Sequence, residues 1–360
     1  MRSAVHQLAS GVARRLLLDR QAEFWLGELD PTWSLGELRA RVVAVISETP
    51  DVKTFVLRPN GAWRGHRAGQ HTTIELEIDG VRVRRCYSIS SAPGDQLPAI
   101  TVKRVPGGRV SGWLHDHVQP GHVLRLAPAA GDFVLPERAP QRLLLLSGGS
   151  GITPVMSMLL DLATRERISD VVFVHHARAE GDVIFRAALA GLAARHRQLR
   201  VVLCLSDGTG GPGRFDEAQL RGLVPDFAER ETFLCGPSGL MERVERMWAS
   251  AGAGARLHVE RFAAPAIPAR LERAGEAPVR VRLTRSDRSF SAGPGTLLEE
   301  LERAGERPRF GCRMGICQTC KCRKQAGSVE NLLTGAISSE PDEDIQPCIS
   351  VARSDVELCL

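Results

Sequence analysis

Short stretches in which apolar and polar positions alternate fill the chain from residue 38 to about residue 137. Residues 41–45, 53–57 and 73–78 alternate or are rich in β-branched side chains, and turn signals such as Asp79-Gly80 separate them. The pattern therefore predicts an antiparallel β-barrel over residues 38–137.

The pattern then changes to continuous apolar runs at residues 143–146, 171–174 and 201–205, which alternate with stretches of helical spacing. Such runs indicate parallel strands that are covered on both faces. We therefore expect an α/β domain over residues 138–263.

Three further segments complete the expected multi-domain fold of α+β and α/β parts. Apolar residues at near-helical spacing predict a helical N-terminal extension over residues 1–37, ending near Pro31. An Ala- and Pro-rich run without apolar periodicity predicts a linker over residues 264–277. Residues 278–360 then form a third domain.

The N-terminal extension carries arginines and no acid in its first 18 residues, but it lacks the continuous apolar region of a secretory signal. A transit peptide is the alternative. The acids from Asp19 onward argue against it, as do Phe24, Trp25 and Leu26, which are expected to anchor the extension by packing. No stretch approaches the roughly 18 apolar residues of a membrane span.

The composition indicates the cellular compartment and bears on nucleic-acid binding. The chain has nine cysteines in 360 residues, four at ligand spacing and the rest scattered, which indicates a reducing compartment rather than a disulfide framework. We therefore predict a cytoplasmic location. The formal net charge of +5 is diffuse, and no basic helix with interleaved aromatic residues argues for nucleic-acid binding.

Four cysteines near the C-terminus form the most specific motif. Cys312, Cys317 and Cys320 have C-x4-C-x2-C spacing, and Cys348 follows after a long gap. This is the ligand spacing of a plant-type 2Fe-2S cluster. Zinc or structural cysteines are the alternatives, but zinc knuckles usually pair two C-x2-C units, whereas here one unit is followed by a lone cysteine.

A second group of residues suits an aromatic cofactor that carries phosphate. Tyr87, the one tyrosine of the chain, can stack on an aromatic ring, while Ser88 can donate to a ring nitrogen and Arg85 can pair with phosphate. Downstream, the turn at Gly108 leads to Ser111, a predicted cap of a helix whose first turn would bind an anion. The alternatives are a barrel strand with a surface tyrosine and an ordinary capped helix.

A glycine loop between an apolar strand and a helix forms a third group. Gly149, Gly151, Thr153 and Pro154 follow a G-x-G-x-x-P pattern, which lets the backbone approach a pyrophosphate. Pro154 suits the first position of the helix. A simple strand-to-helix turn is the alternative.

Together with the later Cys235-Gly236-Pro237 turn, these motifs resemble the ferredoxin-NADP reductase superfamily over residues 38–360. R-x-Y-S followed by G-x-x-S is similar to its flavin-binding signature, and the glycine loop with the Cys-Gly-Pro turn is similar to its nicotinamide domain. The resemblance implies an antiparallel β-barrel flavin domain, a parallel α/β nicotinamide-binding domain and a β-grasp 2Fe-2S ferredoxin domain. It implies an electron relay from NAD(P)H through flavin to the cluster.

The resemblance also implies a residue set for each cofactor. FAD, favoured over FMN, would be held by Arg85, Tyr87, Ser88, Val102, Lys103, Gly108, Arg109, Val110 and Ser111. The nicotinamide dinucleotide would be held by Gly149, Gly151, Thr153, Pro154, Arg178, Cys235, Gly236 and Pro237. Tyr87, Ser88 and Cys235 would lie at the site of hydride transfer, with Cys235 as a positioning residue.

Two cues for the choice of nucleotide disagree. Arg178 could receive the 2'-phosphate of NADPH, whereas Asp207 would repel it. The sequence leans slightly towards NADPH, with NADH as the alternative.

The resemblance is strongest to reductases that serve membrane di-iron fatty-acyl desaturases or alkane hydroxylases. The expected partner is therefore such a membrane enzyme, and any membrane contact of this chain would be peripheral and through that partner. The alternative is the reductase component of a soluble Rieske or cytochrome P450 oxygenase system. A hypothesis of another class is a redox sensor without turnover.

Two further patterns are expected to be structural. His175 and His176 are adjacent in a strand, so their side chains point to opposite faces and cannot readily share one ion. The acidic run at residues 340–344 is expected to be a solvated loop, with docking of a basic electron partner as the alternative.

Overall fold

The structure is a computed structural model that describes residues 19–206, 215–262, 279–293, 295–311, 315 and 320–360. The chain divides into two compact units, Met1–Arg261 and Phe262–Leu360. The predicted linker, Asp207, and the proposed ligands Cys312 and Cys317 lie outside the described residues, as do the apolar positions of the first 18 residues. No described helix is long and apolar enough to cross a membrane.

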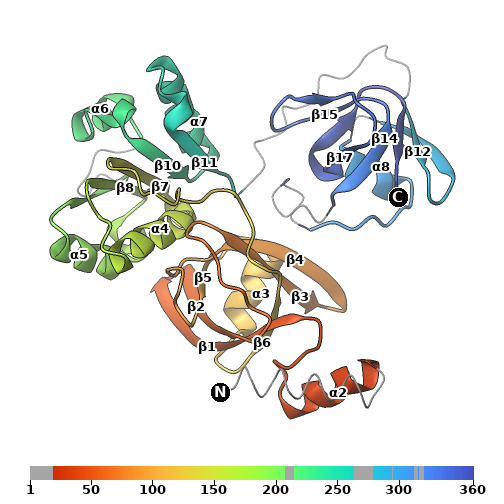
Figure 1. The fold of residues 1–360 in the computed structure, drawn as a ribbon, viewed down its shortest axis with the longest axis horizontal. Helices are drawn as coiled ribbons and strands as arrows, with labels where there is room; N and C mark the ends of the chain where they lie inside the picture. The colour runs from red at the N-terminus through yellow and green to blue at the C-terminus, as the bar shows by residue number, and fades with distance from the viewer. Residues whose placement is uncertain (1–18, 207–214, 263–278, 294, 312–314, 316–319) are drawn as a thin grey trace. The chain divides into compact units, whose positions relative to one another are not determined.

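The first unit begins with the predicted antiparallel barrel (Figure 1). Its strands, in the spatial order β4-β3-β6-β1-β2-β5, close into a barrel where Ile89, just after β4, bridges Ile100 on β5. Inward-facing apolar residues and one face of helix α3 fill the interior. The elements are β1 (Leu38–Thr49), β2 (Val52–Pro59), β3 (His71–Ile78), β4 (Val81–Ser88), β5 (Ala99–Lys103), α3 (Arg109–His117) and β6 (Val123–Leu126).

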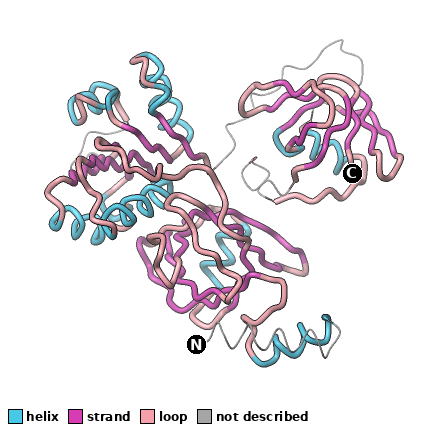
Figure 2. Tube along the Cα trace, viewed as in Figure 1, coloured by secondary structure: helices cyan, strands magenta, loops and turns pink. Residues whose placement is uncertain are grey.

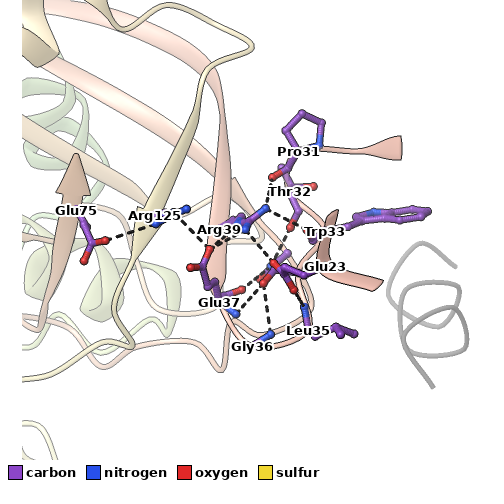
Figure 3. A network of polar contacts seen from close by, with 12 residues as sticks. Glu23, Pro31, Thr32, Trp33, Leu35, Gly36, Glu37, Arg39, Glu75 and Arg125 are labelled. Carbon is purple, nitrogen blue, oxygen red and sulfur yellow. Dashed lines mark hydrogen bonds and ion pairs between the residues drawn. The ribbon is translucent and has the colours of Figure 1, made fainter. Parts of the chain in front are cut away.

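Helix α2 (Asp19–Leu29) is fixed to the barrel by polar contacts (Figure 3). The Glu23 carboxylate accepts from the Leu35 amide at 2.8 Å and from Arg39 at 2.9 Å. Leu26 is buried, but Phe24 and Trp25 are each 59% exposed, so the expectation that they anchor the extension is wrong. A helix turns about 100° per residue, so neighbours of a buried position point away from the surface on which the helix lies.

A five-stranded parallel sheet follows, in the order β11-β10-β7-β8-β9. Leu143 and Leu145 pack beneath α4 and α5, whereas Leu144 and Leu146 pack beneath α6 and α7, which explains the unbroken apolar run. The helices therefore cover both faces (Figure 2). The elements are β7 (Leu143–Gly148), α4 (Ile152–Thr164), β8 (Val171–Ala177), α5 (Arg186–Arg195), β9 (Leu199–Leu205), α6 (Glu217–Leu223), β10 (Glu231–Cys235), α7 (Ser238–Ser250) and β11 (Leu257–Glu260), with short 3-10 turns η1 (Gly149–Gly151), η2 (Glu180–Asp182), η3 (Phe227–Glu229) and η4 (Gly254–Arg256).

The second unit is the ferredoxin-like fold that was expected, a mixed sheet in the order β13-β12-β19-β14-β17 packed against α8. Strands β12 and β19 are parallel, and α8 starts at a capping box of Thr296 and Glu299. A small sheet, β16-β15-β18, completes the unit. The elements are β12 (Val279–Leu283), β13 (Arg288–Ala292), α8 (Leu297–Arg303), β14 (Cys322–Ala326), β15 (Val329–Asn331), β16 (Ile337–Ser338), β17 (Glu343–Ile345), η5 (Pro347–Ile349), β18 (Ser350–Ala352) and β19 (Val356–Leu358).

Candidate functional site

The glycine loop lies where β7 passes through η1 into α4. Gly149 has φ of +53°, a conformation that favours glycine. A methyl group at Gly151 would overlap the carbonyl of Cys235 and lie 2.6 Å from the Gly236 nitrogen. The two loops therefore touch backbone to backbone. The helix begins at Ile152, so Pro154 is its third residue and not its first, still within the turn whose N–H groups lack helical partners.

Cys235 ends β10 and lies in register between Ser147 on β7 and Glu260 on β11. Its side chain is fully buried, and this burial raises the pKa of the thiol well above its usual value. The thiol is therefore neutral and poorly nucleophilic, as a positioning residue would be. Pro237 follows as the N-cap of α7.

Glu260 is a candidate site residue that the sequence reasoning missed. Burial, and to a smaller degree Asp132, raises the pKa of its carboxyl to about 7. The carboxyl can therefore hold or release a proton near neutral pH beside the Cys235 thiol. The available signal was its place at the carboxyl end of a parallel strand, where ligands of α/β sheets bind.

The residues of the R-x-Y-S motif lie on β4 and differ in exposure. Arg85 is exposed, Tyr87 packs against the barrel core and Ser88 is buried. Burial raises the pKa of the Tyr87 phenol, so it remains a hydrogen-bond donor at physiological pH. Arg85 and Tyr87 share one side of the strand, and Ser88 points to the other.

The structure also shows how the downstream flavin candidates are held. Val102 and Val110 are buried in the barrel core, so their backbones, not their side chains, are available to a ligand. Arg109 donates to the Ile78 carbonyl at 2.7 Å and pairs with Asp79 at 3.3 Å.

Ser111 is not the helix cap that was expected. Helix α3 starts at Arg109 after Gly108, and the Ser111 hydroxyl accepts from the Val105 amide at 3.1 Å. It therefore closes the preceding turn. Ser111 is three residues beyond the cap position Gly108, still in the first turn of the helix, so its hydroxyl can reach back to the preceding loop.

A cavity of about 480 Å³ opens at the carboxyl ends of β7, β8 and β9. Its basic side chains are Lys103, Arg178 and Arg243. Asp51 lies 3.3 Å from Lys103 and 3.9 Å from Arg178, while Asp182 pairs with Arg178 at 3.1 Å. The cavity is lined by Lys103, Gly148, Gly149, His176, Ala177, Arg178, Asp182, Cys204, Ser206, Phe215, Pro237, Gly239, Leu240 and Arg243.

This cavity fits a phosphorylated dinucleotide. Glycine backbone, a helix start and three cations meet at the edge of the sheet where such ligands bind. Gly149, Pro237 and Arg178 line it directly, whereas Gly151, Thr153 and Cys235 do not. Gly151 lies against the Cys235 carbonyl, and the Thr153 hydroxyl donates to the Ser150 carbonyl at 3.0 Å.

The adjacent histidines take opposite faces of β8, as expected. Ser147 Oγ lies 2.9 Å from Nδ1 of fully buried His175, while His176 faces the cavity and packs edge-on against Phe215. Burial lowers the pKa of His175 to about 3 and that of His176 to about 4. Both imidazoles are therefore neutral and add no charge to the cavity.

In the second unit the structure brings Cys320 and Cys348 together. Both are buried, and their sulfur atoms are 3.2 Å apart, too far for a disulfide. Gly315 has φ of +77°, and its carbonyl accepts from Gln346 at 2.7 Å, which ties the motif loop to the segment before Cys348. Two adjacent buried thiols fit the sulfur ligation of an iron-sulfur cluster.

Two acids of the run before Cys348 pair with cations of their own unit. Asp344 lies 3.1 Å from Lys321 and 3.4 Å from Arg323, and Glu343 lies 3.7 Å from buried Lys324. Docking of a basic partner at this run stays a prediction.

Family models match the chain in three consecutive segments. An oxidoreductase FAD-binding domain matches residues 39–135, an oxidoreductase NAD-binding domain residues 145–246, and a 2Fe-2S iron-sulfur cluster binding domain residues 281–353. An NADPH oxidoreductase of Mycobacterium tuberculosis is 40% identical, covering 99% of this chain and 92% of that protein. The chain belongs to the ferredoxin reductase superfamily with a fused 2Fe-2S domain.

Two further matches extend over most of the reductase. The glycine betaine monooxygenase reductase subunit of Pseudomonas aeruginosa is 37% identical over 90% of this chain and 96% of its own length. The solved structure of phthalate dioxygenase reductase matches with a TM-score of 0.62 and 25% identity, covering 90% of this chain and 98% of that one. The reductase is therefore an NAD(P)H-dependent oxidoreductase with FAD and a 2Fe-2S cluster as cofactors.

Proposed function

We propose that this reductase is the electron-transfer component of an oxygenase system. The similarity to the glycine betaine monooxygenase reductase subunit over 90% of the chain carries the proposal, and phthalate dioxygenase reductase supports it. Both names give an oxygenase as the context of the reductase. The alternative in the sequence reasoning, a soluble oxygenase partner, is therefore favoured over the membrane desaturase or hydroxylase. The cytoplasmic location remains a prediction.

When bound, the flavin supplies conversion of a hydride's two electrons into single-electron steps, and the cluster carries single electrons. On the barrel, the Tyr87 ring and the Arg85 guanidinium are proposed to hold the flavin, together with the Ser88 hydroxyl. The remaining proposed FAD residues, Val102, Lys103, Gly108, Arg109, Val110 and Ser111, surround the first turn of α3 and the end of β5.

The nucleotide is proposed to bind in the cavity at the end of the parallel sheet. Gly149 and Gly151 let the backbone approach its phosphates, and Arg178 is proposed to pair with a phosphate. The buried Cys235 thiol lies beside the Glu260 carboxyl where the two strands end. Cys312, Cys317, Cys320 and Cys348 are proposed as the four cluster ligands.

An anaerobic titration with NADPH and, separately, NADH tests this function. We expect the flavin absorbance to bleach before the cluster absorbance, and a Cys317→Ser variant to keep flavin reduction but lose reduction of cytochrome c. If neither nucleotide reduces the flavin in protein with an intact cluster, the reductase function is wrong and a redox sensor replaces it.

Reconstitution with candidate acceptor enzymes tests which kind of protein receives the electrons. The reductase is combined with a Rieske oxygenase, a cytochrome P450 and a membrane di-iron desaturase, and substrate-dependent NAD(P)H oxidation is measured for each. Coupled turnover with an oxygenase supports the proposal, and turnover with the desaturase alone contradicts it.

A further inference from the structure

A basic, aromatic segment follows α8 in the ferredoxin-like unit. Arg307 and Arg309 are exposed, and Phe310 is 43% exposed. Neither arginine side chain makes an ion pair or hydrogen bond with any residue in the described part of the chain. The segment therefore presents two cations beside an aromatic ring, a composition that is enriched in protein interfaces.

This segment leads directly into the proposed cluster loop. Phe310 is two residues from Cys312, and because each residue spans at most about 3.6 Å, their Cα atoms are within about 8 Å. Gly311, between them, is buried, so Phe310 stands where the chain enters the interior. A partner resting on this segment would lie close to the cluster.

Ion pairing differs between this segment and the acids that precede Cys348. Asp344 pairs with Lys321 and Arg323, and Glu343 lies 3.7 Å from Lys324. Asp344 and Glu343 are thus paired within the unit, whereas Arg307 and Arg309 make no ion pair in the described part of the chain. The resulting field attracts an anionic surface.

We propose that Arg307, Arg309 and Phe310 form the docking surface for the electron acceptor, and that the acceptor presents an acidic patch beside its own redox centre. This inference rests on the proposed function as a reductase. A partner bound to this surface would face the cluster loop. Because the surface is charged, complex formation would be sensitive to salt, as is usual for small electron-transfer interfaces.

Two forms of cytochrome c serve as probes, the native cationic protein and its succinylated anionic form. Binding to the oxidised reductase is measured by interferometry against ionic strength, and reduction is measured with NADPH. We expect tighter binding and faster reduction of the anionic form at low salt. Arg307→Glu/Arg309→Glu should lower the affinity and the reduction rate of the anionic form by about tenfold or more, because electrostatic steering changes association rates by 10- to 1,000-fold. The same variant should raise the affinity and the reduction rate of the native form.

The matched control is Arg280→Glu/Arg285→Glu, the same change in charge on β12 and the turn that follows it. In the sheet order these positions lie towards the edge opposite β14 and β17, which adjoin the cysteines. The control should change binding of the anionic form less than Arg307→Glu/Arg309→Glu does, because only Arg307 and Arg309 lie next to Phe310 and the proposed cluster loop in the chain. Cluster absorbance confirms that each variant is assembled.

Phe310→Ala should weaken binding of the anionic probe without changing its salt dependence. Equal effects of the two double variants, or no preference of the wild-type protein between the probes, would overturn the proposal. If NADPH fails to reduce the flavin, the proposed function fails, whereas the binding measurement on oxidised protein still tests the surface independently.

Discussion

Buried cysteines in two regions of this molecule have different surroundings. Cys235 stands alone at the end of β10, enclosed by the glycine loop and Glu260, and its thiol is held neutral. Cys320 and Cys348 lie in the other unit with sulfur atoms 3.2 Å apart. The first environment keeps the thiol protonated. The second places two sulfur atoms close enough together to bind one iron-sulfur cluster.

The comparison shows that burial alone does not define what a cysteine does. Desolvation disfavours the charged thiolate at Cys235, where no residue in the described part of the chain compensates for it. At Cys320 and Cys348 an iron-sulfur cluster would stabilise the thiolates by bonding to the sulfurs. The number and spacing of neighbouring sulfurs therefore decide between a packing residue and a ligand.

The largest expected effect is loss of the cluster in Cys348→Ser. Removing a ligand should exceed the roughly 10- to 100-fold loss of metal affinity that follows removal of an outer contact. Iron and sulfide content and visible absorbance provide the measurement. Cys322→Ser is the matched control, because Cys322 is also buried but lies outside the motif, and cluster loss in the control alone would reverse the assignment.

The Cys235 region should be sensitive to the glycine that abuts it. Gly151→Ala places a methyl group against the Cys235 carbonyl and should destabilise the first unit by about 1–3 kcal/mol or more, because overpacked sites relax poorly. It should also weaken NADPH binding. Thermal unfolding and nucleotide titration measure both effects.

Gly149→Ala is the comparison variant for the same loop. A Cβ there meets no atom within 4 Å, so its cost is the left-handed backbone alone, about 1–2 kcal/mol. A larger loss of stability for Gly149→Ala than for Gly151→Ala would show that backbone conformation, and not contact with Cys235, determines which substitutions this loop tolerates.

Glu260 gives the Cys235 region a dependence on pH. Its pKa is raised from 4.5 to about 7, so its contribution to stability is complete below pH 4.5 and is lost as the pH rises to 7. The loss over that whole range amounts to roughly 3–4 kcal/mol. Urea unfolding at pH 5.5 and 8 should show a smaller pH effect in Glu260→Gln than in the wild type, and Glu77→Gln, an exposed control, should behave as the wild type.

The smallest effect is expected at the rim of the nucleotide cavity. Arg178 is 71% exposed and shared between Asp182 and Asp51, so Arg178→Gln should lower kcat/KM for NADPH by only about two- to fivefold. The value for NADH should not change. An equal fall for both nucleotides would mean that Arg178 does not distinguish the 2'-phosphate.

Much of the fold follows from local pattern. Alternation over residues 41–45 and 73–78 predicted barrel strands, and the run at 143–146 predicted a sheet covered on both sides, because side-chain direction in a strand depends only on position. The Phe24 and Trp25 expectation failed because apolar character does not show which face of a helix meets its neighbour.

The sequence by itself determined the cofactor class of this protein, since the spacing of Cys312, Cys317 and Cys320 and the order of the motifs are properties of the covalent chain. Tertiary structure decided which distant groups meet. Cys235 and Glu260 become neighbours through the register of β10 and β11, and the pairing of β14 with β17 brings Asp344 to Lys321. Burial and ion pairing depend on distances in space, and strand register and loop path set those distances.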